Sequence, residues 1–310
     1  MNIKYILIVM GEPYSTFSEI LGKYFYNFKN NKKKLILIGN VNLVKKQLSN
    51  LGYNIKLNQI IDYKSAKLDK LNIININFKY KKVFSKISNL SSSYIEKSFK
   101  KSLEIIGENK NNCVLINGPI SKKTFLKKKY LGITEFLSKK TKVVNQVMLI
   151  YNKNFSVSPL TTHIPIKDVN KQISKKKIYN NVLKINEFFI KKIKLKPKIA
   201  ILGLNPHCET IDKFSEEEKI IIPAIKKLKQ KKINIFGPFS ADTFFIKNNF
   251  NKFNVVVGMY HDQVITSIKT IYSFDAINIT IGLPFIRISP DHGPNEKMIG
   301  KNKSNPISLI

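Results

Sequence analysis

The sequence has few of the residues that build disulfide-rich or membrane-spanning proteins. Its 310 residues include two cysteines, no tryptophan and a single arginine, Arg287. Two thiols in a chain of this length imply no disulfide framework, so we expect Cys113 and Cys208 to be free. The apolar residues come in short runs, none of membrane-spanning length, and the first of them predicts a buried strand rather than a secretory signal. We therefore expect a cytoplasmic protein with no membrane segment.

Acidic residues are also scarce, because 20 Asp and Glu against 54 Lys and Arg give a formal net charge of +34. Such a charge can indicate nucleic-acid binding. Here, however, the lysines are scattered among Asn and Ile, without the arginines and interleaved aromatics that nucleic-acid sites commonly use. We expect a solvated lysine surface that binds no nucleic acid but can attract a phosphorylated substrate.

Short apolar runs alternate with segments of helical period, a pattern that predicts a largely parallel sheet covered by helices. The expected strands span residues 4–9, 34–38, 112–116, 144–150, 198–203, 233–236, 253–258 and 276–281. The expected helices span residues 16–28, 92–107, 174–194 and 215–230. Ser15 or Thr16 is placed to cap the first helix, with Glu19 completing a capping box. Segment 58–90 is weakly patterned, and we expect it to be peripheral.

The unusual residues follow the expected strands, in the loops where open α/β sheets bind ligands. These loops read NGPIS (117–121), TTHIP (161–165), GLNPHCE (203–209), GPFSADT (237–243), GMYHDQ (258–263) and GLPFIRISPDHG (282–293). We expect them to converge on one crevice.

Three of the four histidines, His163, His207 and His261, lie in such loops. Neutral imidazoles at separate loop tips are good ligands for Zn²⁺ or Co²⁺, and three protein ligands leave a position open for substrate. The alternative is that each is a structural histidine with satisfied hydrogen bonds, since their wide spacing forms no local metal motif. We assign His292, in SPDHG, to loop structure or to the outer surroundings of the metal.

Arg287 stands out because every other cationic side chain is a lysine. A planar guanidinium can bind phosphate or carboxylate with two parallel hydrogen bonds, which lysine cannot do. A buried structural ion pair is the alternative. Lys269 and Asn278 lie in the same third of the chain, and the three side chains together would form an anion pocket.

Several motifs carry a resemblance to a known family. In order, they are GPIxK, GxTEFL, THIP, GLNPH, GPxxADTxF, MYHDQ and NITxGLPFIRxSxDHG. The set resembles the 4-hydroxythreonine-4-phosphate dehydrogenase (PdxA) family from about residue 6 onward. The resemblance implies a two-domain α/β/α subunit similar to isocitrate and isopropylmalate dehydrogenases, with residues 1–133 and 282–310 in one domain and 134–281 in the other. It also implies a homodimer with the active site in the interdomain cleft at the dimer interface.

The resemblance assigns roles to particular residues. It makes the three loop histidines, His163, His207 and His261, metal ligands shared between two subunits, with Zn, Co or Mg as the ion. It makes Thr134, Lys269, Asn278 and Arg287 substrate-binding residues, and we add Asp242 to Lys269 as a catalytic candidate. The implied cofactor is NAD or NADP, although no residue can be assigned to it because the sequence has no Rossmann fingerprint.

The implied reaction belongs to pyridoxal 5'-phosphate synthesis. The C3 hydroxyl of 4-(phosphooxy)-L-threonine is oxidised to a ketone at the expense of NAD(P), and loss of CO₂ gives 3-amino-2-oxopropyl phosphate. The metal would stabilise negative charge on the hydroxyl oxygen. Lys269, Arg287 and Asp242 would orient the phosphate and carboxylate ends of the substrate.

The sequence departs from the family at several positions. Ile133 replaces the histidine of GHTEFL, and GEPYSTFSE (11–19) and CETIDKFSEEE (208–218) lack the usual glycines. Two further hypotheses therefore stay open. One is a dehydrogenase of another phosphorylated four-carbon acid, threonate or erythronate 4-phosphate. The other is a degenerate, non-catalytic metal-binding homologue. We favour an active enzyme because the three histidines are present together with Lys269, Asn278 and Arg287.

Overall fold

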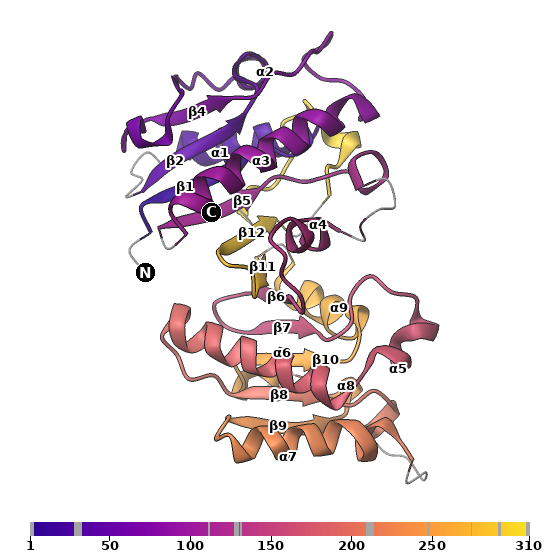
Figure 1. Ribbon diagram of the computed structural model, residues 1–310. Helices are drawn as coiled ribbons and strands as arrows, with labels where there is room; N and C mark the ends of the chain where they lie inside the picture. Colours follow the sequence, from indigo (N-terminus) through magenta and orange to yellow (C-terminus); the bar gives the residue numbers. More distant parts are fainter. Residues whose placement is uncertain are drawn as a thin grey trace. The chain divides into compact units, whose positions relative to one another are not determined.

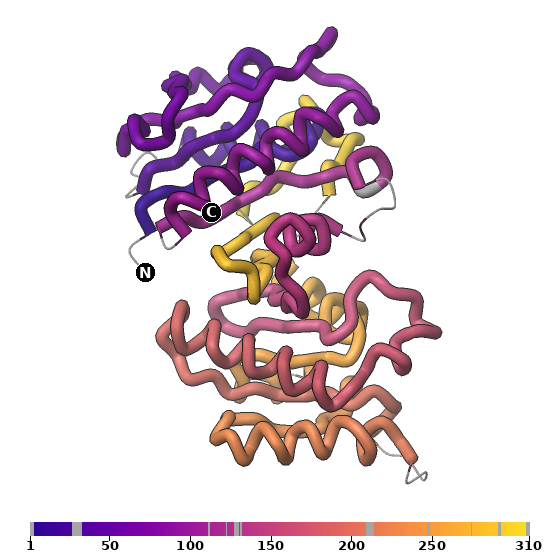
Figure 2. The backbone as a smooth tube through the Cα atoms, in the orientation of Figure 1, coloured from indigo at the N-terminus to yellow at the C-terminus, as the bar shows by residue number. Residues whose placement is uncertain are grey.

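The computed structural model describes residues 3–27, 33–110, 112–126, 130, 132–208, 214–246, 249–273, 275–290 and 293–307. The chain forms two compact α/β units (Figure 1). Unit 1 contains Met1–Thr141 and Leu283–Ile310, and unit 2 contains Lys142–Gly282. In Figure 2 the yellow C-terminal segment returns to the indigo and violet elements of unit 1. Within the described ranges, no helix is both long and apolar enough to cross a membrane.

Unit 1 is built on parallel strands. In spatial order they are β3 (Leu57–Ile60), β4 (Leu71–Asn75), β2 (Lys34–Gly39), β1 (Tyr5–Val9), β5 (Cys113–Asn117) and β12 (Ile286–Pro290). Alternate residues of these strands enter two different apolar clusters. One cluster includes α3 (Ser92–Glu108) and α4 (Ile133–Lys140), and the other includes α1 (Phe17–Asn27) and α2 (Val41–Asn50). Side chains of a strand alternate between its two faces, so unit 1 is a three-layer α/β/α sandwich.

Unit 2 has a mixed sheet. Its strands, in spatial order, are β11 (Ile277–Ile281), β6 (Val147–Tyr151), β7 (Ser156–Pro159), β10 (Val255–Gly258), β8 (Ile199–Leu202) and β9 (Ile235–Phe239). The last four run parallel, while β6 is antiparallel to both β7 and β11. The helices around it are α5 (Val169–Gln172), α6 (Lys175–Phe188), α7 (Ile222–Gln230), α8 (Ala241–Phe244) and α9 (His261–Tyr272). Helix α9 packs on β7 and β10, and α6 and α7 pack on each other and on β6 and β9 (Figure 1).

Every strand and helix expected from a clear periodic pattern overlaps an observed element. Helices α1 and α3 match their expected ranges closely, and the range 174–194 forms α6 followed by a π-helical turn, Phe189–Ile193. Strand β7 was not expected because its sequence, SVSP, is half polar. Its two serines are buried, and their hydroxyls donate to the carbonyls of Met148 (2.7 Å) and Asn152 (3.2 Å). A local hydrogen bond to a neighbouring carbonyl allows a buried strand to carry serine.

The expectation that segment 58–90 is peripheral was wrong for β4. This strand lies between β2 and β3, and its Asn72 is completely buried. The Asn72 amide donates to three backbone carbonyls, those of Leu35, Lys67 and Lys70, at 2.8 to 3.0 Å. Because its hydrogen bonds are satisfied inside the protein, this polar residue can occupy the core of a strand.

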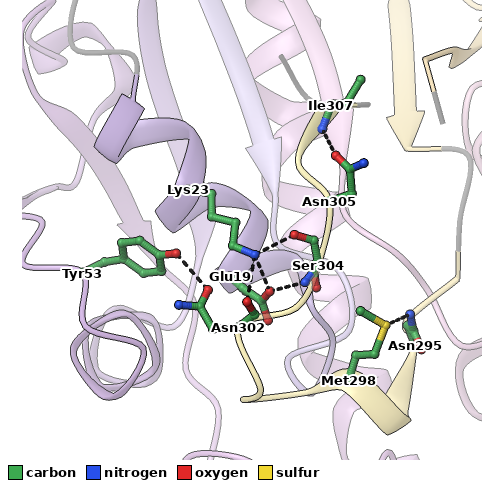
Figure 3. A network of polar contacts seen from close by, with 9 residues as sticks. All are labelled: Glu19, Lys23, Tyr53, Asn295, Met298, Asn302, Ser304, Asn305 and Ile307. Carbon is green, nitrogen blue, oxygen red and sulfur yellow. Dashed lines mark hydrogen bonds and ion pairs between the residues drawn. The ribbon is translucent and has the colours of Figure 1, made fainter.

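The predicted capping box at the start of α1 was also wrong. Glu19 turns away from the first turn and accepts from Lys23 Nζ at 3.0 Å and from the Ser304 backbone N–H (Figure 3). Lys23 also donates to the carbonyls of Asn302 (3.1 Å) and Ser304 (2.6 Å). The Thr16 N–H donates instead to the Pro294 carbonyl at 3.2 Å. The segment after β12 therefore supplies the partners that a capping box would have supplied from within the helix.

Glu12 lies in the loop that follows β1 and is 1% exposed. The loop passes close to residues 118 and 119, where a Cβ on Gly11 would lie 2.6 Å from the Pro119 carbonyl oxygen. One Glu12 oxygen accepts from the Ser91 hydroxyl at 3.0 Å, and the other has no hydrogen-bond partner in the described part of the chain. Burial raises the pKa of Glu12 to about 7, against an ordinary value of 4.5.

This pKa predicts a loss of stability as the pH rises. Between pH 4.5 and 7 the folded protein holds a proton on Glu12 that the unfolded chain releases, so the free energy of unfolding falls across this range, by roughly 3 kcal/mol. In Glu12→Gln, which mimics the neutral acid, this fall should be absent. Urea unfolding of both proteins from about pH 4.5 to 8 measures the difference. Parallel curves for the two proteins would contradict the assignment.

Candidate functional site

Four of the sequence-predicted site residues of unit 2 follow four neighbouring parallel strands. In spatial order, β7 leads to His163, β10 to His261, β8 to His207 and β9 to Asp242. Backbone hydrogen bonds between neighbouring chain segments continue beyond the strands. The Leu160 N–H donates to the Gly258 carbonyl at 2.8 Å, and the Gly203 N–H donates to the Phe239 carbonyl at 2.9 Å. The carboxyl ends of parallel strands share one edge of a sheet, so these four loops form one polar rim.

His163 and His261 lie together on this rim. Their ring centroids are 5.8 Å apart and their planes are inclined by 38°. The loops that carry them are joined because the Thr161 N–H and hydroxyl both donate to the Met259 carbonyl, at 3.2 and 2.8 Å. His261 Nδ1 lies 2.6 Å from an Asp262 carboxylate oxygen, which leaves Nε2 as the nitrogen that can bind a ligand.

His207 pairs with Asp242 at the other end of the rim. Its Nδ1 lies 3.4 Å from Asp242 Oδ2, and the imidazole is 70% exposed. A hydrogen bond from the Ser240 hydroxyl is the main cause that lowers the pKa of Asp242, so this carboxylate is ionised at neutral pH. Both His207 and Cys208 have left-handed backbone conformations, with φ of 57° and 54°.

The side chains of the rim meet only some of the requirements for binding a divalent ion. Imidazole is a common ligand of transition metals, and the separation of the His163 and His261 rings is within reach of a shared ion. Within the described ranges, however, no three side chains of His, Cys, Asp or Glu are grouped closely enough to hold a metal. The three-histidine site therefore stays a prediction. His292 lies outside the described residues, and both cysteines are free, as expected.

Lys269 and Asn278 lie elsewhere in unit 2. Lys269 is eight positions beyond His261 in α9, about 12 Å along the helix axis, and is exposed. Asn278 is the second residue of β11, and its side-chain oxygen is buried without a hydrogen-bond partner in the described chain. Unit 2 alone therefore does not bring either residue to the histidine rim.

Arg287 and Thr134 form a cluster in unit 1. Arg287 is 1% exposed, and its Nε donates to Asn117 Oδ1 at 2.8 Å, while Nη1 donates to the Thr134 hydroxyl at 3.5 Å. Burial lowers the pKa of Arg287 to about 10, so the guanidinium remains charged at neutral pH. The side chain of Glu135 opposes this shift. Asn117 and Thr134 are both neutral, so these two hydrogen bonds hold the guanidinium in place without cancelling its charge.

Sequence reasoning missed two kinds of residue near these side chains. Asn117 was noted only as the start of a loop, although a polar residue that ends a buried strand is a signal for a site. Gln263 and Glu217, which hold the loops of unit 2 through backbone groups, were not singled out. Most of their partners are main-chain atoms, which the sequence does not identify.

Comparison with known proteins identifies first the fold and then the family. The chain is similar to a β-decarboxylating dehydrogenase from Thermococcus kodakarensis, with a TM-score of 0.50, 11% identity and coverage of 99% of this chain and 81% of that one. It is more similar to a 4-hydroxythreonine-4-phosphate dehydrogenase structure from Burkholderia phymatum, with a TM-score of 0.79, 26% identity and coverage of 99% and 95%. The expected fold class is thereby confirmed.

The sequence comparisons agree. The family described as "Pyridoxal phosphate biosynthetic protein PdxA" matches residues 31–310, and the chain belongs to it. A 4-hydroxythreonine-4-phosphate dehydrogenase from Sulfurihydrogenibium sp. is 36% identical over 98% of this chain and 95% of its own. A D-threonate 4-phosphate dehydrogenase from Pectobacterium atrosepticum is 34% identical over 58% of this chain and 56% of its own. The chain is therefore an oxidoreductase of the dehydrogenase type that these relatives represent.

The contact between Arg287 and Asn117 can be tested by a double-mutant cycle. A buried hydrogen bond to a charged group contributes about 1.5–3 kcal/mol, so Arg287→Met and Asn117→Ala should be coupled by an energy of that size. Urea unfolding of the two single variants and the double variant measures it. Additive effects would show that the bond contributes nothing to stability.

Proposed function

We propose that the protein oxidises 4-(phosphooxy)-L-threonine with NAD or NADP and releases CO₂ and 3-amino-2-oxopropyl phosphate, in the synthesis of pyridoxal 5'-phosphate. One observation carries the proposal: in a chain of the PdxA family, three histidines and an aspartate follow four neighbouring parallel strands of unit 2. A cytoplasmic location fits the free thiols.

His163, His207 and His261 would hold a divalent ion, Zn, Co or Mg. When bound, the ion would supply positive charge to stabilise negative charge on the C3 oxygen, and NAD or NADP would supply the hydride acceptor. Since the three imidazoles form no group of three in the described part of one chain, we propose a homodimer in which two copies share the site.

The protein's own side chains would bind and orient the substrate. Arg287 and Thr134 offer a buried guanidinium and a hydroxyl, Lys269 an exposed positive charge and Asn278 a buried amide oxygen. Such groups suit the phosphate, carboxylate and amine of the substrate. They would hold C3 in line with the nicotinamide.

Asp242 would act through His207. An ionised carboxylate 3.4 Å from Nδ1 favours the tautomer that carries its proton on Nδ1, which leaves the lone pair of Nε2 free to bind a cation. A carboxylate in this position also holds the exposed imidazole in one orientation. We therefore place Asp242 among the residues needed for turnover, together with Lys269.

An NADH assay with 4-(phosphooxy)-L-threonine tests the proposal. We expect turnover by the wild-type protein, loss of turnover in EDTA and its return when Zn²⁺ or Co²⁺ is added. His207→Asn should lower kcat/KM by about 100-fold, because it removes an imidazole. Asparagine tolerates the left-handed backbone at this position, so the variant should fold. Turnover that chelator leaves unchanged would refute the metal-dependent mechanism.

A second substrate class, threonate or erythronate 4-phosphate, is favoured by one observation. Ile133, at the first position of α4, packs against the apolar cluster of unit 1, where the family motif has a histidine. An apolar side chain beside Thr134 offers no hydrogen bond to a substrate amine. The D-threonate 4-phosphate dehydrogenase among the relatives supports such a change of substrate.

Ile133→His tests this alternative. If Ile133 sets the preference, the histidine should shift the ratio of kcat/KM values toward 4-(phosphooxy)-L-threonine by about tenfold, the effect of one added hydrogen bond. Ile133→Val is the control, since it keeps an apolar side chain. An unchanged ratio in Ile133→His would remove the reason for the second substrate class. Absence of turnover with all three substrates would favour a non-catalytic homologue.

A further inference from the structure

Two polar side chains, one partly buried and one buried, connect the histidine loops of unit 2 to each other. We propose that Gln263 and Glu217 are positioning residues that grip segment 203–205 from two sides and so fix His207 relative to His261. The inference rests on the proposed metal site, but it concerns two residues that do not themselves bind the metal.

Gln263 lies in the first turn of α9, two residues after His261. Its Oε1 accepts from the Met259 N–H at 2.6 Å, and its Nε2 donates to the Gly203 carbonyl at 2.8 Å. Met259 follows β10 and Gly203 follows β8, so one side chain joins the ends of two neighbouring strands. Both ends of the amide are used, which fixes its orientation as well as its position.

Glu217 holds the same segment from the other side. It is 2% exposed, and its Oε1 accepts from the backbone N–H groups of Leu204 (2.7 Å) and Asn205 (2.8 Å). Its Oε2 accepts from the Asn205 side-chain amide at 2.7 Å. Burial alone would raise the pKa of this carboxyl, but the hydrogen bonds from Asn205 and Leu204 outweigh burial and lower it. Glu217 is therefore an ionised carboxylate surrounded by donors.

The turn that directly follows segment 203–205 needs such support because its backbone conformation is unfavourable. His207 and Cys208 both have left-handed backbones, each costing roughly 1–2 kcal/mol for a residue with a side chain. A Cβ on Gly203 would overlap the Cys208 sulfur and lie 2.9 Å from Glu217 Oε1, so the turn is closely packed. Strained conformations of this kind persist only where the surroundings impose them. Gln263 and Glu217 hold the residues that lead directly into this turn.

Variants that keep the shape of each side chain test the inference. Glu217→Gln replaces one acceptor oxygen by an NH₂ group that faces the Asn205 amide. Gln263→Glu places a carboxylate against the Gly203 carbonyl. Glu218→Gln is the matched control, because Glu218 is the neighbouring exposed glutamate and the substitution removes the same charge. Asn205→Ser is a milder variant that keeps both backbone hydrogen bonds to Glu217, in case Glu217→Gln does not fold.

Co²⁺ titration of the metal-free proteins, followed by visible absorption, is the deciding measurement. We expect Glu217→Gln and Gln263→Glu to weaken Co²⁺ binding by about 10- to 100-fold and to change the absorption bands, as substitutions that disturb ligand orientation do. Glu218→Gln should bind like the wild type. A purely stabilising role would lower the melting temperature of the metal-free protein but leave the Kd and the bands unchanged, and that result would overturn the inference.

Amide hydrogen exchange tests the positioning role of Gln263 and Glu217 separately from the proposed metal site. In the metal-free variants, the amides of Leu204, Asn205 and Met259 should exchange faster than in the wild type, whether or not a metal binds. If the His207→Asn variant binds Co²⁺ as tightly as the wild type does, the proposed three-histidine metal site is refuted. Unchanged exchange in both variants would instead show that Gln263 and Glu217 do not hold the loop.

Discussion

Parallel pairing of β7, β10, β8 and β9 is the constraint on which the chemistry of unit 2 depends. Strands that run in one direction end at one edge, and the residues that follow them must share that edge whatever their distance in sequence. His163 and His261 are far apart in the sequence, yet their rings are neighbours. Hydrogen bonds between the loops, such as those of Thr161 and Gln263, extend this order beyond the last strand residues.

Three buried ionisable side chains show how their surroundings decide whether a buried group is charged or neutral. Glu217 accepts from three N–H groups and is ionised, whereas Glu12 accepts from the Ser91 hydroxyl and has a pKa near neutrality. Burial lowers the pKa of Arg287 to about 10, the charge of Glu135 opposes that shift, and the guanidinium remains charged at neutral pH. Burial therefore favours the neutral form of each group, and the surrounding hydrogen bonds and charges decide whether that form prevails.

The sequence was sufficient for the elements with a regular apolar period and for the loops that follow them. YILIV at β1 and VVVG at β10 leave little choice but buried strands, and the three loop histidines follow strands of this kind in unit 2. The sequence did not predict strands β7 and β4, because their polar residues Ser158 and Asn72 form hydrogen bonds that only the folded chain provides. It also could not reveal Glu217, whose role depends on main-chain atoms of residues 204 and 205.

The position of Arg287 gives the chain a built-in chemical reporter. Dicarbonyl reagents that modify guanidinium groups have a single target here, and it lies almost wholly out of solvent contact between β5 and α4. Labelling therefore requires that the guanidinium become accessible, as the proposed substrate binding does. The rate of arginine modification measures how often this side chain becomes accessible, without any engineered probe.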